Sequence, residues 1–134
     1  MSCKSAIYIA LTTPAAVAAG GTIPLGTIIR RFGRCLALEG NGIGINESGY
    51  YDVAASITVL PTAAGVITAT LLKDGVAVPG GTASGTAAAA GDPVNLSIAS
   101  LIRQMGCCNG QSVLTVVLSA AGTVNNMAIV AERV

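Results

Sequence analysis

Apolar and polar positions alternate most regularly along the segment Gly49–Leu60. Its odd-numbered positions are mostly apolar, and its even-numbered positions are mostly small or polar. A period of two is the signature of a β-strand that turns one face toward a core. The pattern therefore predicts a central strand here, with Tyr51, Val53, Ile57 and Val59 pointing inward.

Similar but shorter patterns recur along the rest of the chain. They predict further strands at Ser5–Ala10, Thr27–Phe32, Cys35–Leu38, Ile43–Asn46, Val66–Leu72, Val76–Val78, Val94–Ile102, Ser112–Ser119 and Val124–Val134. The segment Thr12–Gly21 is rich in Pro, Ala and Gly and is predicted to be a connection. Asp74-Gly75 between two apolar runs is a strong signal for a tight hairpin.

Two segments after this hairpin are harder to assign. Pro79-Gly80-Gly81 is predicted to break the second arm of the hairpin, because proline removes a donor from the strand ladder. The run Thr82–Ala90 fits either an edge strand or a loop, and its glycine and threonines disfavour a helix. In total the chain predicts about eight to ten short strands and no helix, a spacing typical of an all-β sandwich or barrel.

The composition adds a hypothesis about assembly. Of the 134 residues, 52% are hydrophobic and only 10% are charged, whereas an average soluble domain is about 25% charged. This fits either a membrane protein or a subunit that buries much of its surface against copies of itself. The apolar window Val53–Leu72 is interrupted by Pro61 and Gly65, which disfavours a membrane-spanning helix. We therefore predict no membrane span and favour self-assembly.

Charge and polar chemistry argue against several other functions. The net charge is +1, and the cluster of Arg30, Arg31 and Arg34 is too small for a nucleic-acid footprint. The chain has no histidine to act as a general base and no carboxylates paired closely in sequence. Asp52 is a candidate catalytic carboxylate, but a structural partner for an arginine is the favoured role. We predict no enzymatic activity and no cofactor.

The four cysteines, Cys3, Cys35, Cys107 and Cys108, do not have the spacing of a zinc site. No metal site is predicted. Thiols packed as small hydrophobic groups are the favoured interpretation. A disulfide between Cys3 and Cys35, or a link between chains, stays open at this point.

Short motifs in a fixed order carry a resemblance to a known family. They are Gly49–Val53, Leu71–Gly75, Val78–Gly80, Val94–Ser97 and Leu114–Val116. Their order resembles that of the C1q and tumour necrosis factor (TNF)-like domains. It is similar in particular to the bacterial and phage type, including the C-terminal domain of spore-surface collagen-like glycoproteins. The resemblance spans residues 22–134 and implies a jelly-roll β-sandwich that assembles into a tight homotrimer.

The resemblance also suggests roles for individual residues. The candidates for core and trimer packing are Tyr51, Val53, Ile57, Val59, Leu96, Ile98, Val116 and Ile129. Residues 1–21 are expected to form an N-terminal strand and anchor segment, with Cys3 and Lys4 as the anchor candidates, ahead of the jelly-roll domain at 22–134.

The absence of a collagen-like Gly-X-Y stalk before this domain leads to an expectation about the particle. A domain that begins near Met1 resembles a phage head decoration or head-fibre protein, located on the virion surface with a capsid protein as partner. The alternative is a binding module on a cell or spore surface that recognises a receptor or a glycan. A carbohydrate ligand therefore stays open.

Overall fold

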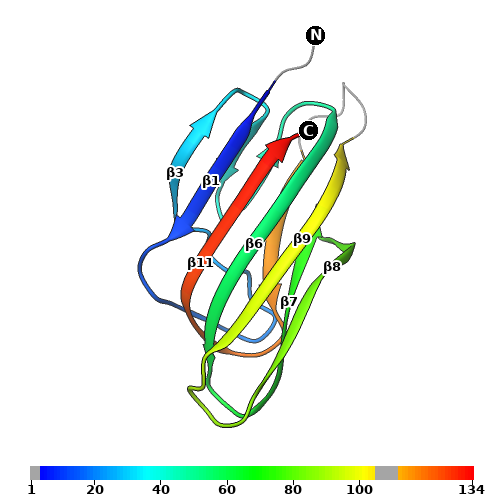
Figure 1. The fold of residues 1–134 in the computed structure, drawn as a ribbon. Coiled ribbons are helices and arrows are strands. Elements are labelled where there is room, and N and C mark those ends of the chain that lie inside the picture. Colours follow the sequence, from blue (N-terminus) through cyan, green and yellow to red (C-terminus); the bar gives the residue numbers. More distant parts are fainter. Residues whose placement is uncertain (1–3, 105–111) are drawn as a thin grey trace.

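Two antiparallel sheets packed face to face form the protein (Figure 1). The computed structural model describes residues 4–104 and 112–134. These residues form eleven strands and no helix. The strands are β1 (Ala6–Leu11), β2 (Ala15–Val17), β3 (Thr27–Phe32), β4 (Leu36–Glu39), β5 (Gly42–Ile45), β6 (Gly49–Pro61), β7 (Gly65–Lys73), β8 (Val76–Ala87), β9 (Val94–Gln104), β10 (Ser112–Leu118) and β11 (Gly122–Arg133). The prediction of an all-β jelly-roll sandwich is confirmed.

Sheet A has the strand order β3-β1-β11-β6-β9, and the short β2 pairs with β11 beside this path. Sheet B has the order β4-β5-β10-β7-β8. The last strand, β11, lies between the first strand, β1, and the central strand, β6, so the two ends of the chain lie at the same end of the sandwich (Figure 1). Strands β8 and β9, at the edges of the two sheets, run side by side (Figure 1).

Alternation places one apolar face of each sheet against the other. In β6 the buried positions are the odd-numbered residues from Tyr51 to Val59. β10 alternates in the same way between buried and half-buried residues. Thirty buried hydrophobic side chains from both sheets form one continuous core. The described residues of one chain therefore enclose a hydrophobic core between the two sheets.

The hairpin between β7 and β8 has the predicted tight turn. Asp74 has φ 52° and Gly75 has φ 82°. Two consecutive positive φ values define the type I′ turn that Asp-Gly favours, because its twist matches that of the flanking strands. The Asp74 side chain also ties the turn to sheet B, since its Oδ1 accepts a 2.9 Å hydrogen bond from the Val113 N–H.

Two strand assignments differ from the sequence prediction. The connection at 12–21 contains β2, which pairs with the start of β11. β8 does not break at Pro79 but continues through it to Ala87, so the segment after Gly81 is an edge strand rather than a loop. Pro79 lies between the pairs Thr70–Thr82 and Leu72–Ala77, where this edge strand has no register partner, so its missing N–H costs no ladder bond. Gly80, at φ 78°, absorbs the extra residues in a bulge opposite Thr70–Leu72.

Candidate assembly surface

The outer face of sheet A consists of the residues on β1, β3, β6, β9 and β11 that point away from sheet B. The strand register aligns these residues in rows across the sheet. One row reads Arg30, Tyr8, Val130, Ala54 and Ala99. A second row, nearer the chain termini, reads Phe32, Ala6, Glu132, Asp52 and Leu101. The middle of this face is therefore built mostly from small side chains.

The small side chains leave a shallow open depression of 410 Å³ on this face. Its lining residues are Ala54, Ala55, Ser56, Ser97, Ile98, Ala99, Ala128 and Val130. They come from three adjacent strands, β11, β6 and β9. Small residues let another backbone approach closely, so the depression fits a flat, close contact with a second protein surface better than it fits a deep ligand pocket.

Larger exposed side chains lie elsewhere on the same face of sheet A. Phe32 and Leu101 are each 60% exposed, and Tyr50 is 49% exposed. Next to Phe32, a separate apolar hollow of 200 Å³ is lined by Ala6, Ile7, Tyr8, Arg30, Arg31, Phe32 and Val130. An exposed apolar area of this kind, edged by charged residues, is typical of protein interaction sites.

The eight residues predicted for core and trimer packing all point to the other side of their strands. Tyr51, Val53, Ile57, Val59, Leu96, Ile98, Val116 and Ile129 are each no more than 3% exposed and belong to the core between the two sheets. For the seven of these residues that lie in sheet A, the alternate residues of the same strands form its outer face, whereas Val116 belongs to β10 of sheet B. A role of the eight residues in packing between subunits stays a prediction.

A polar network closes the end of the sandwich that carries the chain termini. The Tyr51 hydroxyl donates a 2.8 Å hydrogen bond to the carbonyl of Glu47. The Arg133 guanidinium donates a 2.8 Å bond to the carbonyl of Ser48 and lies 3.9 Å from the Cys35 sulfur. Burial, followed by the nearby Cys35, raises the pKa of Tyr51 to about 12. The network therefore links β6, β11 and the loop at 46–48.

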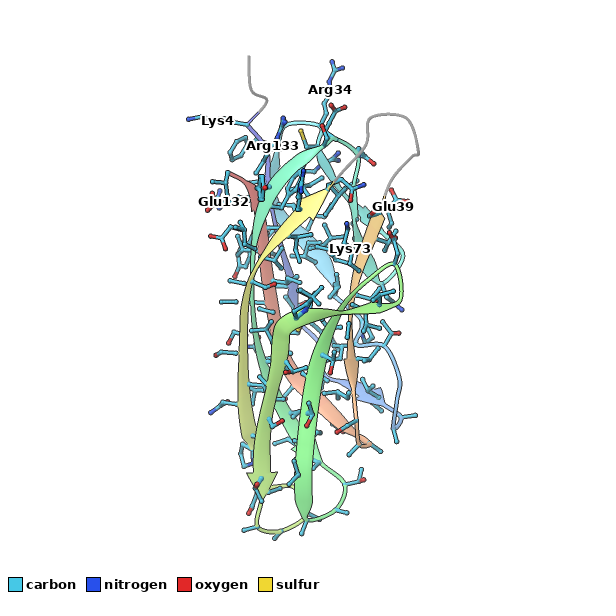
Figure 2. All side chains as sticks on the ribbon, turned by 90° about the vertical axis from the view of Figure 1, so that its right-hand side faces the viewer. Lys4, Arg34, Glu39, Lys73, Glu132 and Arg133 are labelled. Atoms are coloured by element: carbon cyan, nitrogen blue, oxygen red, sulfur yellow. The ribbon has the colours of Figure 1, made fainter. Side chains whose placement is uncertain are left out.

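Of the two anchor candidates, only Lys4 is among the described residues. Lys4 is exposed at the end that carries this polar network, and Cys3 lies outside the described residues, as do Cys107 and Cys108. Cys35 is buried as a thiol. The charged side chains labelled in Figure 2 gather in this half of the molecule. The turn regions at the opposite end, 61–67 and 119–121, are built from uncharged, mostly small residues.

A second candidate site is an open groove of 440 Å³ between the β7–β8 hairpin and β9. Its walls include Val76, Val78, Pro79, Leu101 and Arg103. The Lys73 ammonium crosses one end and donates a 2.9 Å hydrogen bond to the Arg103 carbonyl. The Arg103 guanidinium lies over the Tyr50 ring, 5.9 Å from its centroid. The groove thus has mostly apolar walls with the cationic Lys73 and Arg103, and the Tyr50 ring contacts Arg103 without lining the groove itself.

Within residues 4–104 and 112–134, no group of three or more His, Cys, Asp or Glu side chains could hold a metal ion. The same residues include no helix that is long and apolar enough to span a membrane. Asp52 is exposed on the outer face of sheet A and does not line the depression or the groove.

The sequence alone indicated only part of this surface. The even-numbered positions of Gly49–Leu60 are mostly small or polar in the sequence, and Ala54 and Ser56 among them line the depression on the outer face. The contributions of Val130, Leu101 and Phe32 were missed, because their place depends on which strands become neighbours. The alternation within each strand does indicate which residues point away from the core. It does not indicate which of these residues come together on one surface, because that depends on how the strands pair.

Comparison with known proteins supports the fold. No protein-family model matches the chain, and no curated protein matches its sequence. Among solved structures, murine APRIL at pH 8.5 is similar with a TM-score of 0.76 and 9% identity, over 98% of this chain and 99% of that chain. The globular domain of zebrafish complement 1qA protein is similar with a TM-score of 0.69 and 8% identity, over 95% and 94%.

The PRD1 vertex protein P5 is also similar, with a TM-score of 0.67 and 14% identity, over 100% of this chain and 99% of that chain. At these identities the likeness concerns the fold alone. The strand order, the two-sheet core and these neighbours agree, and the chain has the jelly-roll fold seen in TNF-like and C1q-like domains.

Proposed function

We propose that the protein is a non-enzymatic structural protein that forms a homotrimer and decorates the surface of a phage virion, as a capsid decoration or head-fibre component. The outer face of sheet A is the single observation that carries this proposal. It exposes Leu101 and Phe32 on the same face as the small-residue depression that Val130 helps to line, while a separate core is buried between the two sheets. Such a face is stabilised when copies cover it, because apolar area leaves water.

The virion is proposed from a second line of support. The PRD1 vertex protein P5 is similar over essentially the whole of both chains, and its name places it on a virus particle. The low fraction of charged residues fits a subunit that is mostly enclosed in an assembly. We further propose that residues 1–21, with Cys3 and Lys4, anchor the trimer to a capsid protein, because Lys4 and the start of β1 lie at the same end of the sandwich as the end of β11.

Size measurement of the full chain tests the assembly. We expect a trimer by light scattering at micromolar concentration. Ala54→Arg places a charge in the middle of the outer face of sheet A and should give a folded monomer. Thr86→Arg places the same charge on an exposed position of β8, outside this face, and should leave the trimer intact. A monomeric wild-type chain overturns the trimer.

Co-sedimentation with capsids that lack this protein tests the virion role. The wild-type trimer should pellet with the capsids, and a variant that lacks the first four residues should stay in the supernatant while remaining trimeric. A full chain that does not bind such capsids argues against decoration.

The groove beside β9 favours a second candidate function, a binding module for a glycan or receptor on a cell or spore surface. Aromatic and cationic groups next to apolar walls are suited to sugars as well as to peptides. A glycan array distinguishes this function: binding that is lost in Tyr50→Ala, without binding to capsids, would reverse the order of the two proposals.

A further inference from the structure

Two carboxylates face each other on the outer face of sheet A. Glu132 of β11 and Asp52 of β6 are direct partners in the strand register. Side chains at such positions have Cβ atoms about 5 Å apart, and like charges there repel each other. Within the described part of the chain, neither carboxylate makes a hydrogen bond or an ion pair. In an isolated chain, water screens this repulsion.

The repulsion between the two carboxylates becomes more costly when a protein surface covers them, because the screening water is lost. The two acids lie between the apolar Ala6 and Leu101 in their row, so a partner that covers the row removes their water. Burying carboxylates without a compensating cation is strongly unfavourable. The surface that covers this row must therefore bring a positive charge to it.

The chain itself supplies one suitable cation. Arg30, on β3, points from the same outer face and makes no hydrogen bond or ion pair within the described residues. Three strand spacings separate β3 from β6, which is about 14 Å, so Arg30 is too distant to pair with Asp52 of its own chain.

The other six basic residues have different positions or contacts. The Arg31 side chain donates to the Leu36 carbonyl, Arg103 stacks on Tyr50, and Lys73 donates to the Arg103 carbonyl. Arg133 belongs to the polar network at the end of the sandwich. Lys4 and Arg34 lie beyond the strands at that same end (Figure 2). Arg30 is therefore the basic residue of the outer face that is left to meet the acids of another copy.

An exposed leucine and an apolar hollow on the same face fit the same contact between two copies. Leu101 is 60% exposed and lies one strand from Asp52. The hollow of 200 Å³ adjoins Arg30. When Arg30 of one copy reaches Asp52 and Glu132 of the next, Leu101 of that next copy lies near the hollow. The edge of one copy then covers the middle of the next, a head-to-tail contact that can close into a ring.

We propose that Arg30 of one copy pairs with Asp52 and Glu132 of a second copy, and that this pairing fixes how the outer faces of sheet A meet. This inference rests on the proposed self-assembly, and it names the residues that pair between two copies. The pairing also gives a partner of opposite charge to the two acids that face each other in the row nearer the chain termini.

Charge exchange tests the pairing. Arg30→Glu should raise the concentration at which the assembly dissociates by at least about tenfold, because it leaves three acids together. The double variant Asp52→Arg/Glu132→Arg should do the same. A triple variant with all three changes exchanges both partners and should recover most of the assembly. Arg34→Glu and Glu39→Arg, at exposed positions off this face, serve as controls of matched charge.

Analytical ultracentrifugation gives the dissociation concentration, and circular dichroism shows that each variant is folded. Unchanged assembly in Arg30→Glu, or a triple variant as weak as Arg30→Glu alone, overturns the pairing while leaving the trimer in place. A wild-type chain that is monomeric overturns the proposed assembly itself and the pairing with it.

Discussion

The Tyr51 hydroxyl and the Glu47 carbonyl are joined by a 2.8 Å hydrogen bond between strand β6 and the loop that precedes it. The ring of Tyr51 is fully buried in the core, whereas its oxygen reaches the polar network at the end of the sandwich. One side chain therefore links the hydrophobic core to the 46–49 loop.

Tyr51→Phe removes this hydrogen bond and keeps the ring in the core. We expect the free energy of unfolding to fall by about 0.5–1.5 kcal/mol, the usual net contribution of one hydrogen bond. Urea denaturation followed by circular dichroism measures the change. Tyr51→Ala also removes the ring and should cost about 3–5 kcal/mol, so equal losses in the two variants would contradict a separate role for the hydroxyl.

Alkaline pH should weaken the fold through the same residue. The pKa of Tyr51 rises from 10.0 to about 12 in the folded chain, chiefly because of burial. Between these two values the unfolded state loses its proton first, so stability is fully present below pH 10 and declines as the pH rises to about 12. Two pKa units correspond to about 2–3 kcal/mol. Denaturation at pH 9 and pH 11.5 should show this decline in the wild type and a smaller one in Tyr51→Phe.

Much of this architecture follows from local patterns in the sequence. The strand at β6 was predicted from the alternation of Gly49–Leu60, and the tight β7–β8 turn was predicted from Asp74-Gly75. Both predictions succeed because strand period and turn type are set by adjacent residues. β2 was missed, since three residues of Ala-Ala-Val form a strand only because β11 lies beside them. The unbroken β8 was missed because its tolerance of Pro79 depends on its edge position.

The candidate surface was harder to predict for the same reason. Asp52 and Glu132 are 80 residues apart in the sequence, and only the pairing of β6 with β11 makes them neighbours. The sequence favoured a structural role for Asp52 as the partner of an arginine. It did not indicate that Glu132 lies opposite Asp52, nor which arginine to propose as the partner. Long-range pairing of strands determines the outer face, whereas local pattern determines only which residues point outward.

Gly49 begins β6 in a conformation that other residues rarely adopt. Its φ is 145°, and a Cβ at this position would lie 2.8 Å from the Arg133 Nε. Gly49→Ala should therefore lower the free energy of unfolding by about 1–3 kcal/mol. Gly65→Ala is a matched control, because Gly65 begins β7 with φ 132° and has no atom within 4 Å of the added Cβ. Thermal unfolding should show a larger loss for Gly49→Ala, and equal losses would mean that the Arg133 contact adds nothing.

The side chain of Asp74 supports the β7–β8 turn through its bond to the Val113 N–H. This hydrogen bond holds the pKa of the Asp74 carboxyl below its usual value. The stabilisation is therefore present above about pH 4 and is lost as the pH falls through the lowered pKa. We expect Asp74→Ala to lower the free energy of unfolding by about 1 kcal/mol at pH 7. Asp74→Asn should lower it less, because asparagine keeps an acceptor oxygen and tolerates a positive φ. Urea denaturation of the three chains at pH 7 and pH 3 tests the order.

Adjacent residues of β6 should separate folding from assembly. Ile57 is 1% exposed and points into the core, whereas Ser56 is exposed and lines the depression on the outer face. Ile57→Ala leaves a cavity and should lower the free energy of unfolding by about 2–5 kcal/mol. Ser56→Lys should change the stability of the isolated chain by no more than about 0.5 kcal/mol, because it is a surface substitution there. In the proposed assembly the new lysine would be buried without a partner. We therefore expect the Ser56→Lys variant to be monomeric at concentrations at which the folded Ile57→Ala variant is still a trimer. Denaturation and ultracentrifugation on both variants distinguish the two effects, and a trimeric Ser56→Lys would remove the outer face of sheet A from the interface.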